Sequence, residues 1–223
     1  MQARAMGVAR PEPRGRPLLA LLALVPLAAC SPYADAERDV AAGGRGLAKL
    51  NPAPKQAYEL VLTLKDAPGP FAIVEGVAQY DVSNYEDCGR ILPATGTAGR
   101  ITSQEPVTLH KVSENEYRGT FYLDRMLDED YYGRGACDWT LTGVGAMLRA
   151  TTSKADTRFL TFVDKKRMEN DSPLTLYYPN LVYPRADTVA NFGASGEEAP
   201  SGYSEDLRDA LFSTTTTVQK LMP

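Results

Sequence analysis

The stretch Tyr58-Glu59-Leu60-Val61-Leu62-Thr63-Leu64-Lys65 decides the fold class of this 223-residue chain. Its large apolar side chains recur at every second position: Tyr58, Leu60, Leu62 and Leu64. Charged and hydroxyl side chains lie among the residues between them. Because successive side chains of a β-strand point to opposite faces, a period of two predicts a strand with one buried face.

Further segments along the chain have strand-like patterns. They are 71–82, 107–112, 117–124, 139–150, 158–163 and 174–183. Turn residues separate them, Pro179 bends the last one or places it at a sheet edge, and no strand–helix–strand alternation is present. The sequence therefore predicts a mainly β fold, an antiparallel β-sandwich of about 7–8 strands over residues 57–185.

The two flanks of this domain have different compositions. Residues 30–56 are rich in Ala, Gly, Pro and charge, which favours a flexible tether. Residues 186–223 are expected to form a C-terminal extension with a loop over 190–202 and a short helix over 204–212, capped by Ser204. The threonines at 214–217 are expected to be frayed or extended.

Residues 1–29 have the organisation of a signal peptide. Four arginines precede an apolar run of 12 residues, Leu18–Ala29. A spanning helix needs about 20 apolar residues, so this run is too short to be one. It ends in Leu27-Ala28-Ala29-Cys30, which resembles the lipobox of bacterial lipoproteins. The resemblance implies cleavage before Cys30 and lipidation of its sulfur; an ordinary signal peptide with a chance cysteine is the alternative.

The lipobox implies a location. The domain would face the periplasm from a lipid anchor, and two or three acyl chains on one cysteine suffice for stable anchoring. Ser31 follows the cysteine, where an aspartate would favour retention in the inner membrane. The outer membrane is therefore favoured.

Lipidation of Cys30 would leave two cysteines, Cys88 and Cys137. In an oxidising compartment they are expected to form a disulfide. Closing a loop of about 50 residues stabilises a fold by about 4 kcal/mol in the chain-entropy model. The sequence has no Cys-x-x-Cys motif and one histidine, so nothing supports a metal or redox role for the pair.

The charge argues against nucleic acid as a partner. The whole chain has 24 basic and 28 acidic residues. The leader contains four of the arginines and Glu12, so its removal leaves 20 basic and 27 acidic residues and a net charge of −7. Affinity for nucleic acid depends on Lys and Arg, whereas an acidic surface permits a basic protein partner.

The densest chemical segment runs from Asp124 to Trp139 (DRMLDEDYYGRGACDW). Asp128, Asp130 and Gly133 match the start of an EF-hand, but aromatic residues occupy two later ligand positions, which leaves only an irregular calcium site as a candidate. As a pair of catalytic carboxylates, acids in one contiguous loop give no sign of separated pKa values. The commonest structure for such a run is an acidic turn and a glycine-rich bend held by Cys137.

The same segment is the candidate for partner recognition. Tyrosine and arginine dominate interface hot spots, and acids beside them accelerate encounter with a cationic partner. The candidate residues are Asp128, Glu129, Asp130, Tyr131, Tyr132 and Arg134. Trp139 instead shares a strand face with Cys137, so we expect it to pack on the disulfide.

No catalytic set is recognisable in the sequence. His110, the single histidine, lies mid-strand without the partners of a triad or a zinc site. The segment 193–196 lacks the strand–turn–helix context of a nucleophile elbow. We therefore expect no enzymatic activity, no cofactor, no metal and no small-molecule substrate.

The lipobox, the motif of residues 128–139 (DEDYYGRGACDW) and the later Leu-Thr-Leu-Tyr-Tyr of residues 174–178 resemble a group of proteobacterial periplasmic lipoproteins of the immunity-protein type. Proteins of that type neutralise toxins that neighbouring bacteria inject, including lipase-like effectors of type VI secretion. The resemblance covers residues 58–183 and implies inhibition of an envelope-targeting toxin. It assigns no functional residue.

The leading hypothesis is therefore a lipid-anchored, protein-binding immunity protein. The alternative is an envelope maintenance or assembly lipoprotein without enzymatic activity, whose deletion would harm the envelope even without competitors. A hydrolase that uses acids of segment 124–138 is a third hypothesis. Unchanged activity after Asp128→Asn and Asp130→Asn would remove it.

Lipidation of Cys30 gives the first prediction. In cells supplied with labelled palmitate, the full chain should carry the label and sediment with membranes, because a diacylated cysteine anchors stably. Cys30→Ala should lose both the label and the membrane fraction, whereas Cys88→Ala, which leaves the lipobox intact, should keep the label. A labelled Cys30→Ala variant would contradict the assignment.

Overall fold

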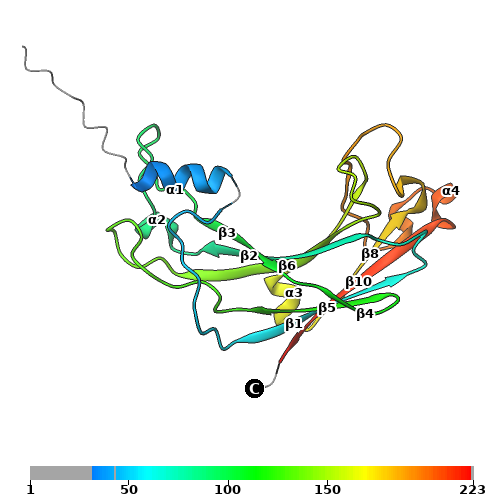
Figure 1. Ribbon diagram of the computed structural model, residues 1–223, viewed down its shortest axis with the longest axis horizontal. Coiled ribbons are helices and arrows are strands. Elements are labelled where there is room, and N and C mark those ends of the chain that lie inside the picture. Colours follow the sequence, from blue (N-terminus) through cyan, green and yellow to red (C-terminus); the bar gives the residue numbers. More distant parts are fainter. Residues whose placement is uncertain (1–31, 43, 222–223) are drawn as a thin grey trace, which may run out of the picture. The chain divides into compact units, whose positions relative to one another are not determined.

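A computed structural model describes residues 32–42 and 44–221, which form two five-stranded sheets (Figure 1). The first sheet has the strand order β4-β5-β1-β10-β8, and the second has the order β3-β2-β6-β7-β9. The pairs are antiparallel except that of β7 with β9. Cys30 and the signal-peptide residues 1–29 lie outside the described residues.

The elements are short and are joined mostly by turns. The strands of the first sheet are β1 (Ala57–Lys65), β4 (His110–Ser113), β5 (Glu116–Tyr122), β8 (Leu174–Pro179) and β10 (Leu211–Lys220). Those of the second sheet are β2 (Ile73–Val82), β3 (Thr102–Val107), β6 (Trp139–Arg149), β7 (Arg158–Asp164) and β9 (Gly193–Ala194). The helices are α1 (Pro32–Ala41), α2 (Tyr85–Cys88), α3 (Lys165–Glu169) and α4 (Glu205–Arg208), with 3-10 turns at Asn180–Val182 and Pro200–Gly202. Among the described residues, no helix has the length and apolar character needed to cross a membrane.

The core lies between the two sheets. The leucines of β1 that recur with a period of two, at 60, 62 and 64, are buried in it. Phe159 from the second sheet meets Tyr178 and Phe212 from the first, with ring centroids 5.1 to 5.5 Å apart. The prediction of a mainly β, antiparallel sandwich with one disulfide and a short C-terminal helix is confirmed.

The structure has ten strands rather than the expected 7–8 because three strands fall in segments expected to be loop or tail. β3 lies almost entirely between the expected strands 71–82 and 107–112, and β9 lies within the loop 190–202. β10 begins at Leu211, where the helix was expected to continue to residue 212, and it includes the threonines that were expected to be frayed or extended. α4 therefore ends at Arg208. The physical reason is that β-branched threonine favours strands.

β10 is a central strand although it is rich in threonine. Thr214 and Thr216 point into the core and are fully buried. Their hydroxyls find partners there: Thr214 lies 3.4 Å from the Tyr178 hydroxyl, and Thr216 lies 2.8 Å from the Thr161 hydroxyl. These hydrogen bonds allow polar side chains to occupy positions that a hydrophobic pattern assigns to apolar ones.

The segment expected to be a flexible tether, residues 30–56, is structured where it is described. α1 is followed by Arg45, whose guanidinium donates to both carboxylate oxygens of Glu105 at 3.0 and 2.9 Å. Burial raises the pKa of Glu105, but hydrogen bonds from Arg45 and Ser103 outweigh it and lower the pKa. Ala48 is buried in the main core cluster, so the segment packs on the sandwich.

The expected domain boundaries at residues 57 and 185 also differ from the structure. Residues 45–50 join the core before β1 begins. Residues 211–220 form β10 inside the first sheet, so the expected C-terminal extension 186–223 supplies part of the domain itself. Contacts between residues far apart in the sequence produce both differences, and local composition does not report them.

The paired hydroxyls of Thr161 and Thr216 link the two sheets and give a stability prediction. Thr216→Val should cost about 1–3 kcal/mol, because it leaves the buried Thr161 hydroxyl without its partner. Adding Thr161→Val should recover most of the loss, since both polar groups are then replaced by apolar groups of the same shape. Urea denaturation of Thr216→Val, Thr161→Val and the double variant checks this. Purely additive losses would contradict it.

Candidate functional site

The segment expected to recognise a partner lies beside the disulfide, near α1 and α2 (Figure 1). Cys88 and Cys137 are bonded across a separation of 49 residues, as the sequence predicts, and both are buried. Trp139 is half-buried and packs on the cluster that contains the disulfide, which was also expected. The disulfide therefore ties this segment to α2, whose last residue is Cys88.

The acids of this segment bind groups of their own chain. Asp128 accepts the backbone N–H of Trp139 at 2.7 Å, and Glu129 lies 2.6 Å from the Lys49 ammonium. One oxygen of Asp130 accepts three consecutive backbone N–H groups, those of residues 132–134, at 2.6 to 3.2 Å. Among the described residues, no group of three or more His, Cys, Asp or Glu side chains is arranged to hold a metal.

The aromatic and basic residues of this segment also contact their own chain. Tyr131 donates its hydroxyl hydrogen to the Leu127 carbonyl. The Tyr132 ring lies 5.7 Å from that of Tyr33 in α1. Arg134 donates to the backbone carbonyls of residues 86 and 89. The structure thus brings the six candidate residues together in one loop, from which Tyr132 contacts α1 and Arg134 contacts α2. Their role toward a partner stays a prediction.

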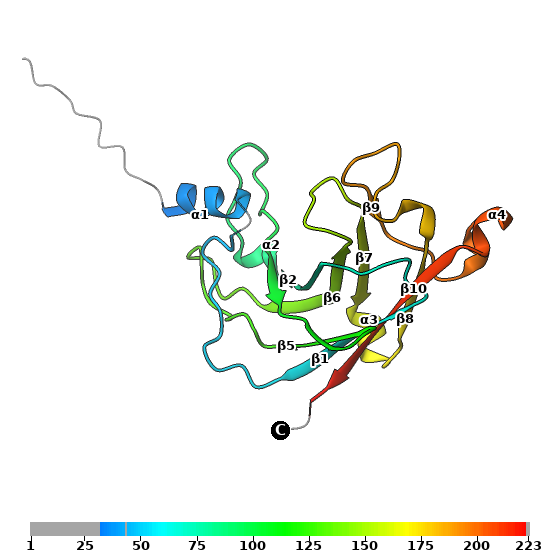
Figure 2. The same ribbon diagram turned by 45° about the vertical axis from the view of Figure 1, so that its right-hand side comes forward.

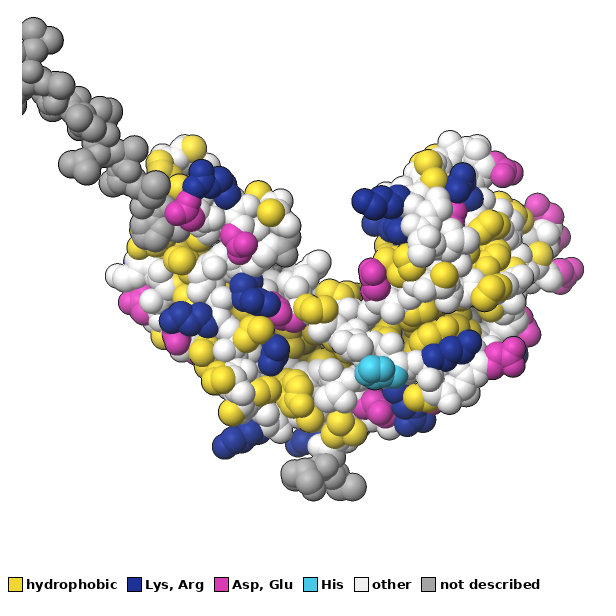
Figure 3. Space-filling model, in the orientation of Figure 1, with side chains coloured by type: hydrophobic (Ala, Val, Ile, Leu, Met, Phe, Trp, Pro, Cys, Tyr) yellow, Lys and Arg dark blue, Asp and Glu magenta, His cyan; other side chains and the backbone are white. Residues whose placement is uncertain are grey.

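The outer face of the second sheet presents apolar side chains outward. Alternation along the strands turns Val77 of β2, Met147 of β6, and Leu160 and Phe162 of β7 away from the core, and Pro106 of β3 lies beside them. Figure 2 shows β6, β7 and β9 side by side, and Figure 3 shows the molecule hollowed above β2 and β6. We call the surface made by these five residues the open face.

Two glycines of β6 shape this face. A Cβ at Gly143 would lie 2.3 Å from the ring of Phe162, and one at Gly145 would lie 2.0 Å from the Thr161 carbonyl oxygen. Glycine is therefore required at both positions, where another backbone or ring approaches closely. Phe162 covers Gly143 with one side of its ring and remains 45% exposed. Elsewhere on this face, a shallow hollow of about 600 Å³ lies over β2 and β3, with Val77, Pro106 and Met147 in its lining.

One end of the open face carries two arginines. Arg149 ends β6 and Arg158 begins β7, and each side chain is partly buried. The Nε atoms of both are buried and lack a hydrogen-bond partner in the structure. Arg149 makes one long contact of 3.4 Å to the side-chain oxygen of Asn191. Within the described residues, neither guanidinium forms an ion pair with an acid.

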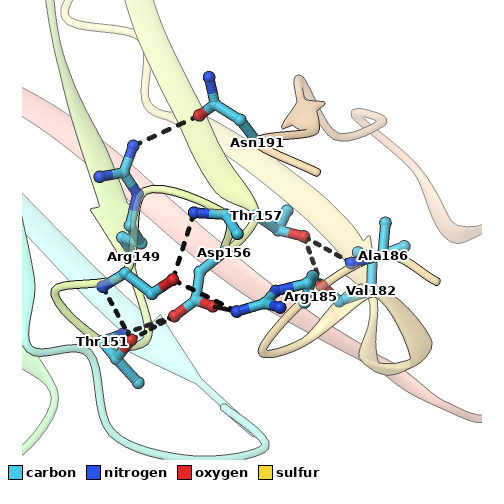
Figure 4. Close-up of polar contacts among 10 residues, drawn as sticks. Arg149, Thr151, Asp156, Thr157, Val182, Arg185, Ala186 and Asn191 are labelled. Atoms are coloured by element: carbon cyan, nitrogen blue, oxygen red, sulfur yellow. Dashed lines mark hydrogen bonds and ion pairs between the residues drawn. The ribbon is translucent and has the colours of Figure 1, made fainter. Parts of the chain in front are cut away.

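Asp156 organises the loop between these arginines, as Figure 4 shows. Its side chain is 3% exposed and accepts from the hydroxyl and the N–H of Thr151 and from the guanidinium of Arg185. The Thr151 hydroxyl and Arg185 lower the pKa of Asp156 below its ordinary value of 3.8, against burial, which raises it. The carboxylate is therefore ionised at neutral pH and holds the loop 150–157 against residue 185.

Thr157 joins the same loop to the segment 182–192. Its hydroxyl donates to the Val182 carbonyl at 2.7 Å and accepts the Ala186 N–H at 3.1 Å (Figure 4). Backbone hydrogen bonds from Arg158 to residue 192 and from Asn191 to residue 155 complete the connection. The two loops form one unit, which fixes the backbone that carries Arg158 and Asn191.

Sequence reasoning missed the open face. The signal available was β7 itself, Arg158-Phe-Leu-Thr-Phe-Val163, which has large apolar residues on both faces, unlike β1. Such a run is typical of a strand covered on both sides. Here one side is the core and the other is exposed.

No protein-family model, curated protein or solved structure was found that matches this chain.

Asp156 gives a prediction about the loops at the arginine end. Asp156→Asn should cost about 1–3 kcal/mol at pH 7, because hydrogen bonds to a charged, buried group are lost. Folding lowers the pKa of Asp156. The carboxylate's contribution to the free energy of unfolding is therefore complete above the ordinary pKa of 3.8, and it disappears as the pH falls through the lower pKa of the folded state. Denaturation from pH 7 to pH 2 checks this, with Asp187→Asn, an exposed acid of the neighbouring segment 182–192, as the control. A difference that does not change with pH would contradict it.

Proposed function

We propose that this chain is a membrane-anchored binding protein, and that its open face holds a protein partner. The observation that carries the proposal is Phe162: a large aromatic side chain, 45% exposed, which lies on β7 opposite Gly145 of β6 and on the same face as Leu160 and Met147. Aromatic anchors on rigid elements are typical of interface hot spots, and contiguous apolar surface on a soluble domain marks an interaction site.

The partner should carry both apolar and acidic side chains. The rows of the sheet place Val77 opposite Gly145 and Gly145 opposite Phe162, which leaves a bare strip of backbone between two apolar side chains. Beyond Met147 and Leu160, this face ends in Arg149 and Arg158, which have no acid of their own chain within ion-pair distance among the described residues. A face with apolar side chains and two arginines at one end favours a partner that places negative charge at the arginine end.

The proposed anchor determines which end of the domain lies nearest the membrane. One residue, Ser31, separates Cys30 from Pro32, the first residue of α1, and these two residue steps span at most about 7 Å. α1 packs on the disulfide loop through Tyr33 and Tyr132. A lipid on Cys30 would therefore hold the domain close to the bilayer by its α1 end.

More specifically, we propose that the protein is an immunity-type inhibitor and that its partner is an envelope-targeting toxin. The lipobox, the secretory disulfide and the binding face support it, and so does the resemblance of the motif at residues 128–139. An envelope assembly protein with a self-encoded partner would use the same face. Deletion separates the two, because only the assembly protein is needed when no competitor is present.

The test uses the full chain and the product of the gene next to its own. We expect a stable complex, and we expect Phe162→Ser to weaken it at least about tenfold, since loss of a buried aromatic anchor costs 2 kcal/mol or more, on the order of a hot spot. Val112→Ser is the matched control: Val112 is 53% exposed but lies in β4 of the other sheet. Isothermal titration measures both affinities.

Three outcomes decide the proposal. A complex that depends on Phe162 and not on Val112 supports it, and protection of sensitive cells supports the immunity form. A complex equally sensitive to both substitutions, or to neither, means that the open face is not the interface. Absence of both a complex and protection overturns the immunity form. Thermal unfolding of each variant verifies that the fold is intact.

A further inference from the structure

The register of the second sheet brings two like charges together. Leu148 of β6 pairs with Phe159 of β7, so the next residues outward, Arg149 and Arg158, stand opposite each other on the outer face. Like charges directly opposite in an antiparallel pair are destabilising. A counter-ion removes that cost, and an acidic side chain of the same chain is the usual source of one.

The acids nearest these arginines do not supply it. In β2, Ile73 pairs with Arg149, and Glu75 lies two residues farther along on the same face. Glu75 forms no ion pair among the described residues. Asp156 is near in sequence, yet its oxygens already bind Thr151 and Arg185 (Figure 4). In the part of the chain that the structure describes, neither positive charge is therefore paired with an acid.

The Nε–H donors of the pair have no acceptor among the described residues. Both Nε–H groups are buried without an acceptor, which is costly for a polar group unless something else satisfies it. A Cβ placed on Gly193 would lie 3.5 Å from Nη2 of Arg158 and 3.7 Å from the side chain of Leu160. Bare backbone thus lies beside the guanidinium, with an apolar side chain next to it.

We infer that Arg149 and Arg158 form a carboxylate-binding site that receives an acidic side chain or the C-terminal carboxylate of the protein partner. This inference rests on the proposed function, because it names the group that the partner presents at the arginine end of the open face. Two guanidinium groups offer planar pairs of N–H donors that match the two oxygens of a carboxylate. Asn191, held by its backbone bond to residue 155, supports Arg149 from the side.

The surroundings favour a carboxylate over a phosphate group. Leu160 and Met147 occupy adjacent positions in one row of the face, so the group that reaches the arginines does so across apolar side chains. A carboxylate on a peptide has an aliphatic flank that covers them. The mature chain has a net charge of −7, which disfavours phosphate-rich polymers and anionic lipid surfaces.

The experiment follows the two buried Nε–H groups by NMR in the full chain labelled with ¹⁵N-arginine. Arg149→Gln and Arg158→Gln assign the two signals. The main probe is hexanoate, a carboxylate with an aliphatic chain. Hexanamide has the same chain without the charge, and inorganic phosphate has charge without the chain. We expect hexanoate to shift both signals with a saturable, weak affinity on the order of millimolar. Each single substitution should weaken that affinity at least about tenfold.

A second readout separates a binding role from a structural one. Without ligand and at low salt, Arg149→Gln and Arg158→Gln should unfold at the same or a higher urea concentration than the parent chain, because repulsion is relieved. Lys65→Gln, which removes one charge from an exposed position of β1, should change neither the hexanoate affinity nor the relative stability. Loss of stability in both arginine variants together with no hexanoate response would overturn the site.

The remaining outcomes are also decisive. Equal binding of hexanamide would show that the apolar flank alone is recognised, and tighter binding of phosphate than of hexanoate would point to a phosphate ligand; either result overturns the carboxylate assignment. Phe162→Ser should leave the hexanoate response intact. If hexanoate fails while the complex still depends on Phe162, only this inference falls and the proposed function stands.

Discussion

The insertion of β10 between β1 and β8 is the constraint on which the rest of this structure depends. Residues 58–65 of β1 pair in unbroken register with residues 213–220, and residues 211–216 pair on the other side with β8. The first sheet is therefore complete only when a segment near residue 215 lies between strands that begin about 150 and 40 residues earlier. Such non-local pairings cost loop-closure entropy before they contribute stability, and they make folding slow.

This strand also fixes the open face, although it lies in the other sheet. Phe212 and Thr216 of β10 contact Phe159 and Thr161 on the inner side of β7. Because strand side chains alternate, anchoring the inner residues determines the direction of the outer ones, Arg158, Leu160 and Phe162. The candidate interface is thus held by core packing on one side and by the Asp156 loop at its end, the kind of support that a precise site requires.

The parts of the fold that the sequence predicts are those with a simple pattern. β1 has apolar residues at every second position, and cysteine arithmetic identified the Cys88–Cys137 disulfide. β10 and β3 were missed because their inward positions carry threonine, serine and Glu105, whose burial becomes favourable only with partners far away in the sequence. A hydrophobic pattern has no means of showing an ion pair between residues 45 and 105.

The candidate site shows the same limit in a different form. Composition singled out residues 128–134 because tyrosine, arginine and acids are common at interfaces, yet in the structure these side chains bind the N-terminal segment, α2 and their own turn. Net charge alone suggests a basic partner, whereas the open face ends in two arginines that pair with no acid among the described residues. The negative net charge and the two arginines are consistent with each other. Net charge acts on the approach of a partner, over a Debye length of about 8 Å. The groups that lose their water at the interface determine which side chains of the partner are bound. For this protein the local arrangement of Arg149, Arg158 and Phe162 therefore says more about a bound partner than the sum of its charges.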